Sequence, residues 1–589
     1  MKRRRVFVEG IGVSPGIAIG HVTLVDRRRV KFPKHHVPED RVEDEIARLE
    51  AAVNEAADAL VALADASTAH DTDEGKLILN AHLMMMRDPL LLESAKKEIE
   101  GDLKCAEWAL KTTVKVIRAR FDAMGHAYFR ERRSDVDFVG ERILAALTKS
   151  GDRAVETVPE DAIVVAHDLS PADVLAFLKR RVRALVTEVG GRTGHTAILA
   201  RAMEIPAVTG CVDVLELAGR GDEIVVDGTR GQVVLHPSRV VLAKYRGIAK
   251  RRALLEEELL VEADLEPVTP DGHTIAIHAN IDLEEDVGNA LAHGASGVGL
   301  YRTEFLYLRR ATLPTVDEHV HSYRYVLDAM GATRPVVMRT VDLGSDKAAP
   351  SLRLPREENP ALGLRACRLG LVERALFEAQ LRALLMASTV GDLRIMFPMV
   401  SGVQELRDVK GALDDVKNAL TREGVPFADD VKVGIMIEVP SAVWVADLLA
   451  EECDFFCVGT NDLIQYALAA DRNNEHVAHL YRPLHPSMLR ALTHVVEAGH
   501  ARGLHVSLCG EMAAEPMHAA LCAALGFDSL SVPLTAIPRL KWAVRRFPMR
   551  DARALLDDCR KKRTVGEVEE TVHRAMRDAL PELISPIES

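Results

Sequence analysis

Over roughly its last 310 residues, the chain alternates short apolar runs with helical segments. Eight of these runs are strand-like: TIAIHA (274–279), GVGLY (297–301), PVVMR (335–339), RIMFPMV (394–400), VGIMIEV (433–439), DFFCVG (454–459), HVSLCG (505–510) and DSLSV (528–532). Parallel strands joined by helices have both faces covered, so their runs are almost wholly apolar. Eight such units predict a (β/α)₈ TIM barrel over residues 265–589.

Residues 36–149 carry helical patterns and no strand-like run. Apolar residues such as Ile46, Leu49 and Val53 recur at helical spacing. This segment is predicted to be an all-helical bundle.

Strand-like runs return on both sides of the predicted bundle. They are GIAIGHVTLVD near the start, AIVVA (162–166), RALVTEV (183–189), IVVD (224–227) and QVVL (232–235). The simplest arrangement is one small α/β domain, residues 1–35 plus 150–236, with the bundle inserted into it. The charged segment 237–264 is then a helical linker that ends before Pro267. The predicted class is therefore α/β, with several domains.

Composition limits what the chain can bind. Its 589 residues carry a formal net charge of −13 at pH 7, which argues against general affinity for nucleic acid or an anionic membrane. The basic start, Lys2 to Arg5, is followed by Glu9 and glycines instead of the apolar stretch of a signal peptide. No run reaches the roughly 18 uncharged apolar residues of a membrane span. We expect a cytoplasmic protein.

Eight cysteines are scattered along the chain without a CxxC pair, a pattern typical of reduced thiols. Cys453 and Cys457 are predicted to pack on one face of a strand. Cys509, in SLCGEM, is by its position alone about equally an inert core thiol or a catalytic one.

A histidine, His195, lies in the glycine-rich sequence GGRTGHTAILAR (190–201). The apolar run after it predicts the start of a helix. Neutral imidazole is available at physiological pH, and backbone N–H groups at a helix start favour an anion such as phosphate. His195 is therefore a candidate nucleophile, and an exposed turn histidine is the alternative.

The barrel prediction brings reactive residue types to one rim, because the carboxyl ends of the strands converge there. Those at or just after the ends of predicted strands are Arg302, Arg339, Glu438, Asn461, Asp462 and Cys509. Those in adjacent loops are Asp342, Asp346, Lys347 and Arg472.

These residue types suit a phosphorylated carboxylate. Glu438 and Asp462 are hard oxygen ligands of the kind that hold Mg²⁺, and three arginines could clamp a small anion through bidentate hydrogen bonds. For any one of these residues, a structural salt bridge is an equally good interpretation. For the whole set of residues, structural salt bridges are a poor interpretation.

Seven motifs together resemble Enzyme I of the bacterial sugar phosphotransferase system. They are GGRTGHTAILARAMEIPAVTG (190–210), GVGLYRTEFLY (297–307), RTVDLGSDK (339–347), EENPALGLRACR (357–368), GIMIEVP (434–440), DFFCVGTNDLIQYALAADR (454–472) and SLCGEM (507–512). The resemblance covers nearly the whole chain, and the ordered set is specific to that family and its phosphoenolpyruvate-utilising relatives.

The resemblance implies a role for each candidate residue. His195 would attack the phosphorus of phosphoenolpyruvate (PEP) through Nε2. Arg302, Arg339 and Arg472, with Asn461 and Asp462, would hold the phosphate and carboxylate of the substrate. Glu438 and Asp462 would bind Mg²⁺. Cys509 would protonate enolpyruvate at carbon to give pyruvate.

The resemblance also implies partners. The phosphoryl group would pass from His195 to a histidine of the small carrier HPr, docked on the helical insert, and the protein would be a homodimer joined through the barrel. Because His195 must then visit two partners in turn, we predict a swivel about residues 238–262.

Two residues depart from the family pattern. Gly194 stands where the family usually has serine, and Ser345 stands where it usually has glycine. Both departures are expected to affect the geometry of their loops and the rate of the reaction.

Three other functions are compatible with parts of the sequence. A PEP-utilising dikinase would need a large nucleotide-binding domain, but fewer than 200 residues precede His195 and no GxxxxGK[ST] occurs. A regulatory, nitrogen-type Enzyme I acting on an HPr paralogue remains the alternative, although no extra N-terminal sensory domain is present. A signalling scaffold without turnover is disfavoured by the intact set of reactive residues.

Overall fold

The computed structural model describes residues 5–580 apart from 26–31, 66–81, 124–126, 150–157, 171–172, 175, 178–179, 192–194, 204, 309–311, 345–351, 353, 355–356, 473 and 475. The chain forms two compact units, residues 1–253 and 254–589. Among the described residues, every helix is too short or too polar to span a membrane.

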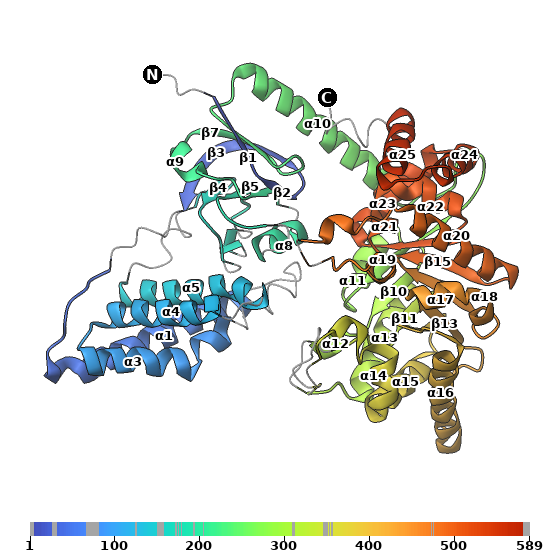
Figure 1. The fold of residues 1–589 in the computed structure, drawn as a ribbon, viewed down its shortest axis with the longest axis horizontal. Helices are drawn as coiled ribbons and strands as arrows, with labels where there is room; N and C mark the ends of the chain where they lie inside the picture. The colour runs from blue at the N-terminus through green and yellow to red at the C-terminus, as the bar shows by residue number, and fades with distance from the viewer. Residues whose placement is uncertain are drawn as a thin grey trace. The chain divides into compact units, whose positions relative to one another are not determined.

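The first unit contains the predicted helical bundle, whose helices lie side by side in Figure 1. They are α1 (Val42–Asp65), α3 (Pro89–Asp102), α4 (Ala106–Ala123) and α5 (Ala127–Leu147). Their apolar stripes meet in one core that includes Leu49, Ile99 and Leu110. Asp88 begins α3 as its N-cap, accepting a hydrogen bond from Leu90 N at 2.8 Å.

An eight-stranded sheet forms the rest of the first unit, in the order β1-β8-β7-β3-β4-β5-β6-β2. Its strands are β1 (Val6–Glu9), β2 (Ile11–Ser14), β3 (Ile17–Val25), β4 (Ile163–Ala166), β5 (Ala184–Thr187), β6 (Ala207–Thr209), β7 (Glu223–Asp227) and β8 (Gln232–Leu235). The pairs from β3 through β6 are parallel, and the other pairs are antiparallel. The bundle enters the chain between β3 and β4, which pair directly.

Among the described residues, this unit also contains α8 (His195–Ala202), α9 (Val214–Leu217) and the first part of α10 (Arg239–Glu262). The first part of α10 packs against the sheet through Leu242, Tyr245 and Ile248. Its last part belongs to the second unit, where Leu259 joins the barrel core. The segment predicted as a helical linker is therefore helical.

The second unit is a closed barrel of eight parallel strands, as predicted. The strands are β9 (Ala276–Ile281), β10 (Val298–Arg302), β11 (Val336–Arg339), β12 (Leu393–Phe397), β13 (Lys432–Ile437), β14 (Phe455–Gly459), β15 (His505–Cys509) and β16 (Ser529–Val532). Each of the eight apolar runs forms one of them. The prediction for Cys453 was wrong, because this residue precedes β14 and its Sγ turns back to Leu449 O.

Helices surround the barrel strands (Figure 1). They are α11 (Asp286–Ala292), α12 (Phe305–Leu308), α13 (Val316–Met330), α14 (Ala366–Val372), α15 (Arg374–Ala387), α16 (Val403–Glu423), α17 (Pro440–Trp444), α18 (Ala446–Leu449), α19 (Thr460–Leu468), α20 (Pro486–Ala501), α21 (Glu511–Ala514), α22 (Ala519–Leu525), α23 (Ile537–Arg546), α24 (Met549–Arg560) and α25 (Val565–Ala579).

Alternation along the barrel strands separates two cores. In β9, Ile277, Ala279 and Ile281 join the large core between strands and helices. A second, smaller cluster combines Leu300, Val337, Met396, Met436, Phe455, Cys457 and Cys509. We call this cluster the apolar floor. Its residues lie on the same strands as the polar residues at the strand ends.

Candidate active site

The barrel brings the predicted polar residues to the carboxyl ends of its strands. Arg302, Arg339 and Cys509 are the last residues of β10, β11 and β15, and Glu438 directly follows β13. Asn461 and Asp462 lie in the first turn of α19, immediately after β14. Because all eight strands are parallel, these ends share one rim.

Arg339 is the most enclosed arginine of the predicted set, with 6% of its surface exposed. Its Nη2 donates to Glu304 Oε1 and lies 3.3 Å from Asp342 Oδ2. Burial lowers the pKa of Arg339, but the carboxylates of Glu304 and Asp342 outweigh it and raise the pKa above its ordinary value. The guanidinium is therefore held as a fixed positive charge at the rim.

A further arginine, Arg365, lies in the same group and was not among the predicted site residues. It is 4% exposed. Its Nη2 is 3.0 Å from both oxygens of Asp342 and 3.2 Å from Asp462 Oδ2, and its Nη1 donates to Tyr466 at 3.2 Å. Arg365 joins a carboxylate after β11 to one after β14. The signal was present, because Arg365 lies within the EENPALGLRACR motif.

Glu438 is a buried carboxylate surrounded by others. Its Oε1 accepts a hydrogen bond from Met399 N at 2.7 Å. Burial first, and then the negative charges of Asp462 and Asp342, raise the pKa of Glu438 well above its ordinary value. Such a group is short of positive charge, which a divalent cation would supply.

The donor set fits Mg²⁺ better than a softer metal. Glu438 and Asp462 offer carboxylate oxygens, and Mg²⁺ is typically held by one or two carboxylates plus substrate oxygens and water. Among the described residues, no group of three or more histidine, cysteine, aspartate or glutamate side chains is arranged as a metal site.

The other predicted substrate-binding residues surround this centre. Asn461 Oδ1 accepts from Glu511 N at 3.0 Å, which fixes its amide. Arg472 Nη1 lies 3.9 Å from Asp462 Oδ1 and has no hydrogen-bond acceptor among the described residues. Arg302 Nη1 is 3.1 Å from Asp282 Oδ1. The structure thus brings Arg339, Arg472 and Asp462 into one linked group and leaves Arg302 paired with Asp282.

Cys509 is buried beneath the rim, 2% exposed. Its Sγ lies 3.2 Å from Cys457 Sγ and 3.4 Å from Val458 O. The contact with Cys457 and burial raise the pKa of Cys509 well above its ordinary value. Cys509 therefore keeps its proton at neutral pH, as a proton donor must.

His195 belongs to the other unit, where it is the first residue of α8, as the sequence predicted. The helix is tied down by Thr196 Oγ1, which donates to Leu169 O at 3.0 Å, and by Arg201 Nε, which donates to Val13 O at 3.1 Å. Before it, Gly190 has φ +115°, a conformation that favours glycine. The imidazole of His195, together with Gly194, Ser345, Asp346 and Lys347, lies outside the described residues.

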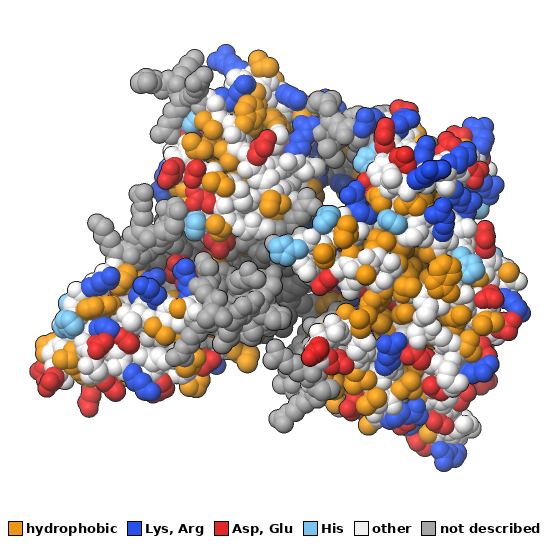
Figure 2. Space-filling view, viewed as in Figure 1, with side chains coloured by type: hydrophobic (Ala, Val, Ile, Leu, Met, Phe, Trp, Pro, Cys, Tyr) orange, Lys and Arg blue, Asp and Glu red, His pale blue; other side chains and the backbone are white. Residues whose placement is uncertain are grey.

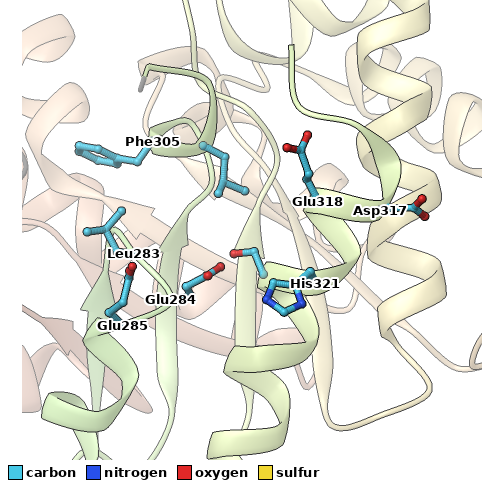
Figure 3. A pocket seen from close by; sticks show the side chains of 9 residues that line it. Leu283, Glu284, Glu285, Phe305, Asp317, Glu318 and His321 are labelled. Atoms are coloured by element: carbon cyan, nitrogen blue, oxygen red, sulfur yellow. The ribbon is translucent and has the colours of Figure 1, made fainter. Parts of the chain in front are cut away.

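A cavity of about 380 Å³ lies beside the barrel and is drawn in Figure 3. Its lining residues are Leu283, Glu284, Glu285, Phe305, Leu306, Asp317, Glu318, His321 and Ser322. Glu284 and Glu285 come from the loop after β9, and Asp317, Glu318 and His321 from the first turns of α13 (Figure 3). Four carboxylates would repel a phosphorylated carboxylate, so this cavity is not the candidate substrate site.

Family models of PEP-utilising enzymes match three parts of the chain. The N-terminal model matches residues 9–132, the mobile-domain model residues 158–231, and the PEP-binding-domain model residues 256–549. The last match spans the whole barrel, from β9 to β16. The barrel, its rim and these three matches together define an enzyme of the PEP-utilising class.

Curated relatives resemble the chain over almost its whole length. The chain is 42% identical to phosphoenolpyruvate-protein phosphotransferase of Geobacillus stearothermophilus, covering 97% of this chain and 98% of that protein. Proteins of the same name from Priestia megaterium and Bacillus subtilis (strain 168) are 40% and 38% identical, covering 96% and 95% of this chain and 98% of each relative. The chain belongs to the phosphoenolpyruvate-protein phosphotransferase family of PEP-utilising enzymes.

Proposed function

We propose that this chain transfers the phosphoryl group of PEP to His195 and then to a histidine of an HPr-type carrier, releasing pyruvate. The observation that carries this proposal is the linked group at the barrel rim. There Asp342, Asp462 and Glu438 lie among the buried guanidinium groups of Arg339 and Arg365. Such an arrangement suits a small substrate that bears phosphate and carboxylate together.

Substrate binding is assigned to Arg302, Arg339, Arg472, Asn461 and Asp462. Two buried donors in this set support the assignment. Arg339 Nε and Arg472 Nη1 have no hydrogen-bond acceptor among the described residues, and an unsatisfied buried N–H is costly. Anionic oxygens of a bound substrate would satisfy both.

Mg²⁺ is assigned to Glu438 and Asp462. Bound there, it would neutralise charge on the phosphate and enolate oxygens of the substrate. The chain itself supplies fixed positions: Met399 N holds Glu438 Oε1, and Arg365 holds Asp462 Oδ2. These contacts reduce the reorganisation that substrate binding requires.

The proton and the phosphoryl group have separate acceptors in this scheme. The P–O bond of PEP breaks as Nε2 of His195 bonds to phosphorus, leaving the enolate of pyruvate with the electron pair of that bond on its oxygen. Cys509 S–H then gives its proton to the methylene carbon, which forms the methyl group of pyruvate. The enclosed, protonated state of Cys509 suits this step.

The proposed division of labour follows the predicted domains. Residues 1–35 plus 150–236 would carry His195, residues 36–149 would dock HPr, residues 237–264 would link the parts, and residues 265–589 would bind PEP and dimerise. Exposed acidic residues in the first turn of α1, Glu43 and Asp44, would complement a basic carrier surface. A swivel about residues 238–262 would let His195 serve both partners.

Dimerisation through the barrel is supported by exposed apolar side chains on the second unit. Trp444 and Leu448, in α17 and α18, are 77% and 49% exposed. Figure 2 shows hydrophobic side chains gathered over the face of this unit that is turned to the viewer. Exposed aromatic residues are enriched at interfaces.

The test is to incubate the protein with PEP, Mg²⁺ and purified HPr candidates and to map phosphorylated residues by mass spectrometry under alkaline conditions. We expect phosphohistidine at residue 195, transfer to one carrier, and loss of both in His195→Ala. His21→Ala, which changes an exposed histidine in β3 of the same unit, should behave like wild type. Carrier phosphorylation that survives His195→Ala would refute the proposal.

A further inference from the structure

Cys457 and Cys509 form a close pair of thiols inside the barrel. Cys457 is the third residue of β14 and Cys509 the last residue of β15. In the strand register, Cys457 lies opposite Ser507, two residues before Cys509. Inward-facing residues alternate along a barrel strand, so Cys457 and Cys509 both project toward the interior. Their sulfur atoms are 3.2 Å apart.

The pair is enclosed by apolar side chains. Cys457 is 0% exposed, and both cysteines belong to the apolar floor, with Met396 and Met436. Among the described residues, Cys509 Sγ has two partners within hydrogen-bonding distance, Cys457 Sγ and Val458 O. A carbonyl oxygen only accepts hydrogen bonds. Cys457 is therefore the group in contact with Cys509 Sγ that is able to donate one.

The ability of Cys457 to donate a hydrogen bond matters once Cys509 has given up its proton. When the methylene carbon of the pyruvate enolate takes the proton, the S–H bond breaks and its electron pair stays on Cys509 as a thiolate. An isolated buried anion is costly, and the neighbouring Val458 carbonyl opposes it. The two thiols share one hydrogen bond, so a thiolate on either sulfur is stabilised by the S–H of the other. The Cys457 S–H is already at the right place to donate.

We propose that Cys457 is a positioning residue for Cys509, which orients the Cys509 thiol before proton transfer and donates a hydrogen bond to the Cys509 thiolate afterwards. The inference rests on the proposed role of Cys509 as the proton donor. In this role Cys457 exchanges no proton with the substrate. The alternative is the role that the sequence predicted for Cys457, which is packing alone.

The experiment compares Cys457→Ala, Cys457→Ser and Cys509→Ala in the full-length protein. Cys522→Ala is the matched control, because Cys522 is a 0% exposed thiol in α22 of the same unit. Two quantities are measured. One is the exchange of pyruvate methyl protons with D₂O in the presence of Mg²⁺, followed by NMR, which reports proton transfer at Cys509. The other is steady-state turnover of PEP with HPr, resolved into kcat and KM.

For Cys457→Ala, we expect methyl exchange and kcat to fall about tenfold while the KM for PEP stays within about twofold, since general acid catalysis typically contributes 10²–10⁴-fold in all. Cys457→Ser keeps a hydroxyl donor and should recover most of the lost rate. A packing role predicts neither this recovery nor a loss confined to kcat. The melting temperatures of Cys457→Ala and Cys522→Ala, each lacking one buried thiol, show how much of any loss is due to instability.

The outcomes separate this inference from the proposed function. If Cys509→Ala loses exchange but Cys457→Ala keeps it, the role of Cys457 is wrong and the role of Cys509 stands. A loss in Cys457→Ala that serine does not recover also overturns the inference. If Cys509→Ala keeps both exchange and turnover, the proposed proton donor itself is wrong, and the inference falls with it.

Discussion

Arg365 Nη2 lies 3.2 Å from Asp462 Oδ2, while the same nitrogen is 3.0 Å from both oxygens of Asp342. One planar guanidinium thus fixes two carboxylates that follow different strands. Lysine cannot reproduce this geometry, because its ammonium is a point charge on a flexible stem. The orientation of Asp462, a proposed Mg²⁺ ligand, therefore depends on Arg365.

For Arg365→Lys, we expect kcat/KM for PEP to fall about 10²-fold and the Mg²⁺ concentration for half-maximal activity to rise. Residues that hold a metal-binding carboxylate in place typically change metal affinity or activity by about 10–100-fold when they are replaced. Arg382→Lys is the matched control. Arg382 forms an exposed ion pair with Glu423 at the surface of α15 and α16, and surface pairs contribute little. Equal kinetics for Arg365→Lys and wild type would contradict the assignment.

Glu438→Gln should separate stability from activity. Burial and the charges of Asp462 and Asp342 disfavour ionised Glu438 in the absence of Mg²⁺. Glutamine removes that charge and still offers an oxygen to Met399 N. We expect the metal-free variant to unfold at a higher temperature, with a gain of about 1–2 kcal/mol, while PEP turnover falls by about 10²-fold or more. Thermal melting in EDTA and a pyruvate assay with Mg²⁺ measure the two effects.

The barrel could be predicted from the sequence because each of its strands is buried on both faces and therefore reads as an apolar run. The rim residues followed from that prediction, since a parallel barrel must gather its strand ends. Arg365 could not be found in this way, because it precedes α14 and ends no strand. Its role depends on a side-chain contact with Asp342, 23 residues earlier.

Other features escaped prediction for local reasons. Strands β1, β2 and β6 are only four, four and three residues long, too short for a periodic pattern to stand out. The contact between Cys457 and Cys509 joins two strands that are paired in space but separated in the chain by α19 and α20. Sequence spacing carries no signal for such a contact.

Trp444→Glu tests the proposed barrel dimer. A charge at an interface core costs several kcal/mol, and aromatic residues often dominate such cores. Sedimentation velocity should therefore show the variant dissociating at protein concentrations where the wild type is dimeric. Val116→Glu changes an exposed apolar residue on α4 of the helical bundle and should leave the association unchanged. Identical sedimentation of Trp444→Glu and wild type would place the interface elsewhere.

Asp168 gives a prediction about pH and stability in the first unit. Burial raises the pKa of Asp168 to about 6, although Leu169 N donates to its Oδ1 at 2.8 Å. An acid whose pKa is higher in the folded than in the unfolded state binds its proton more tightly when folded. Its contribution to stability is therefore complete below about pH 4 and is lost as the pH rises through about 6.

Asp168→Asn removes this dependence, because asparagine stays neutral and its Oδ1 still accepts from Leu169 N. We expect the variant and the wild type to have equal stability near pH 4. At pH 8, the variant should be more stable by about 1 kcal/mol, since the side chain is only partly buried. Urea unfolding of the first unit, followed at several pH values, measures the difference. A difference between the two proteins that is the same at pH 4 and pH 8 would show that burial does not favour the protonated carboxyl.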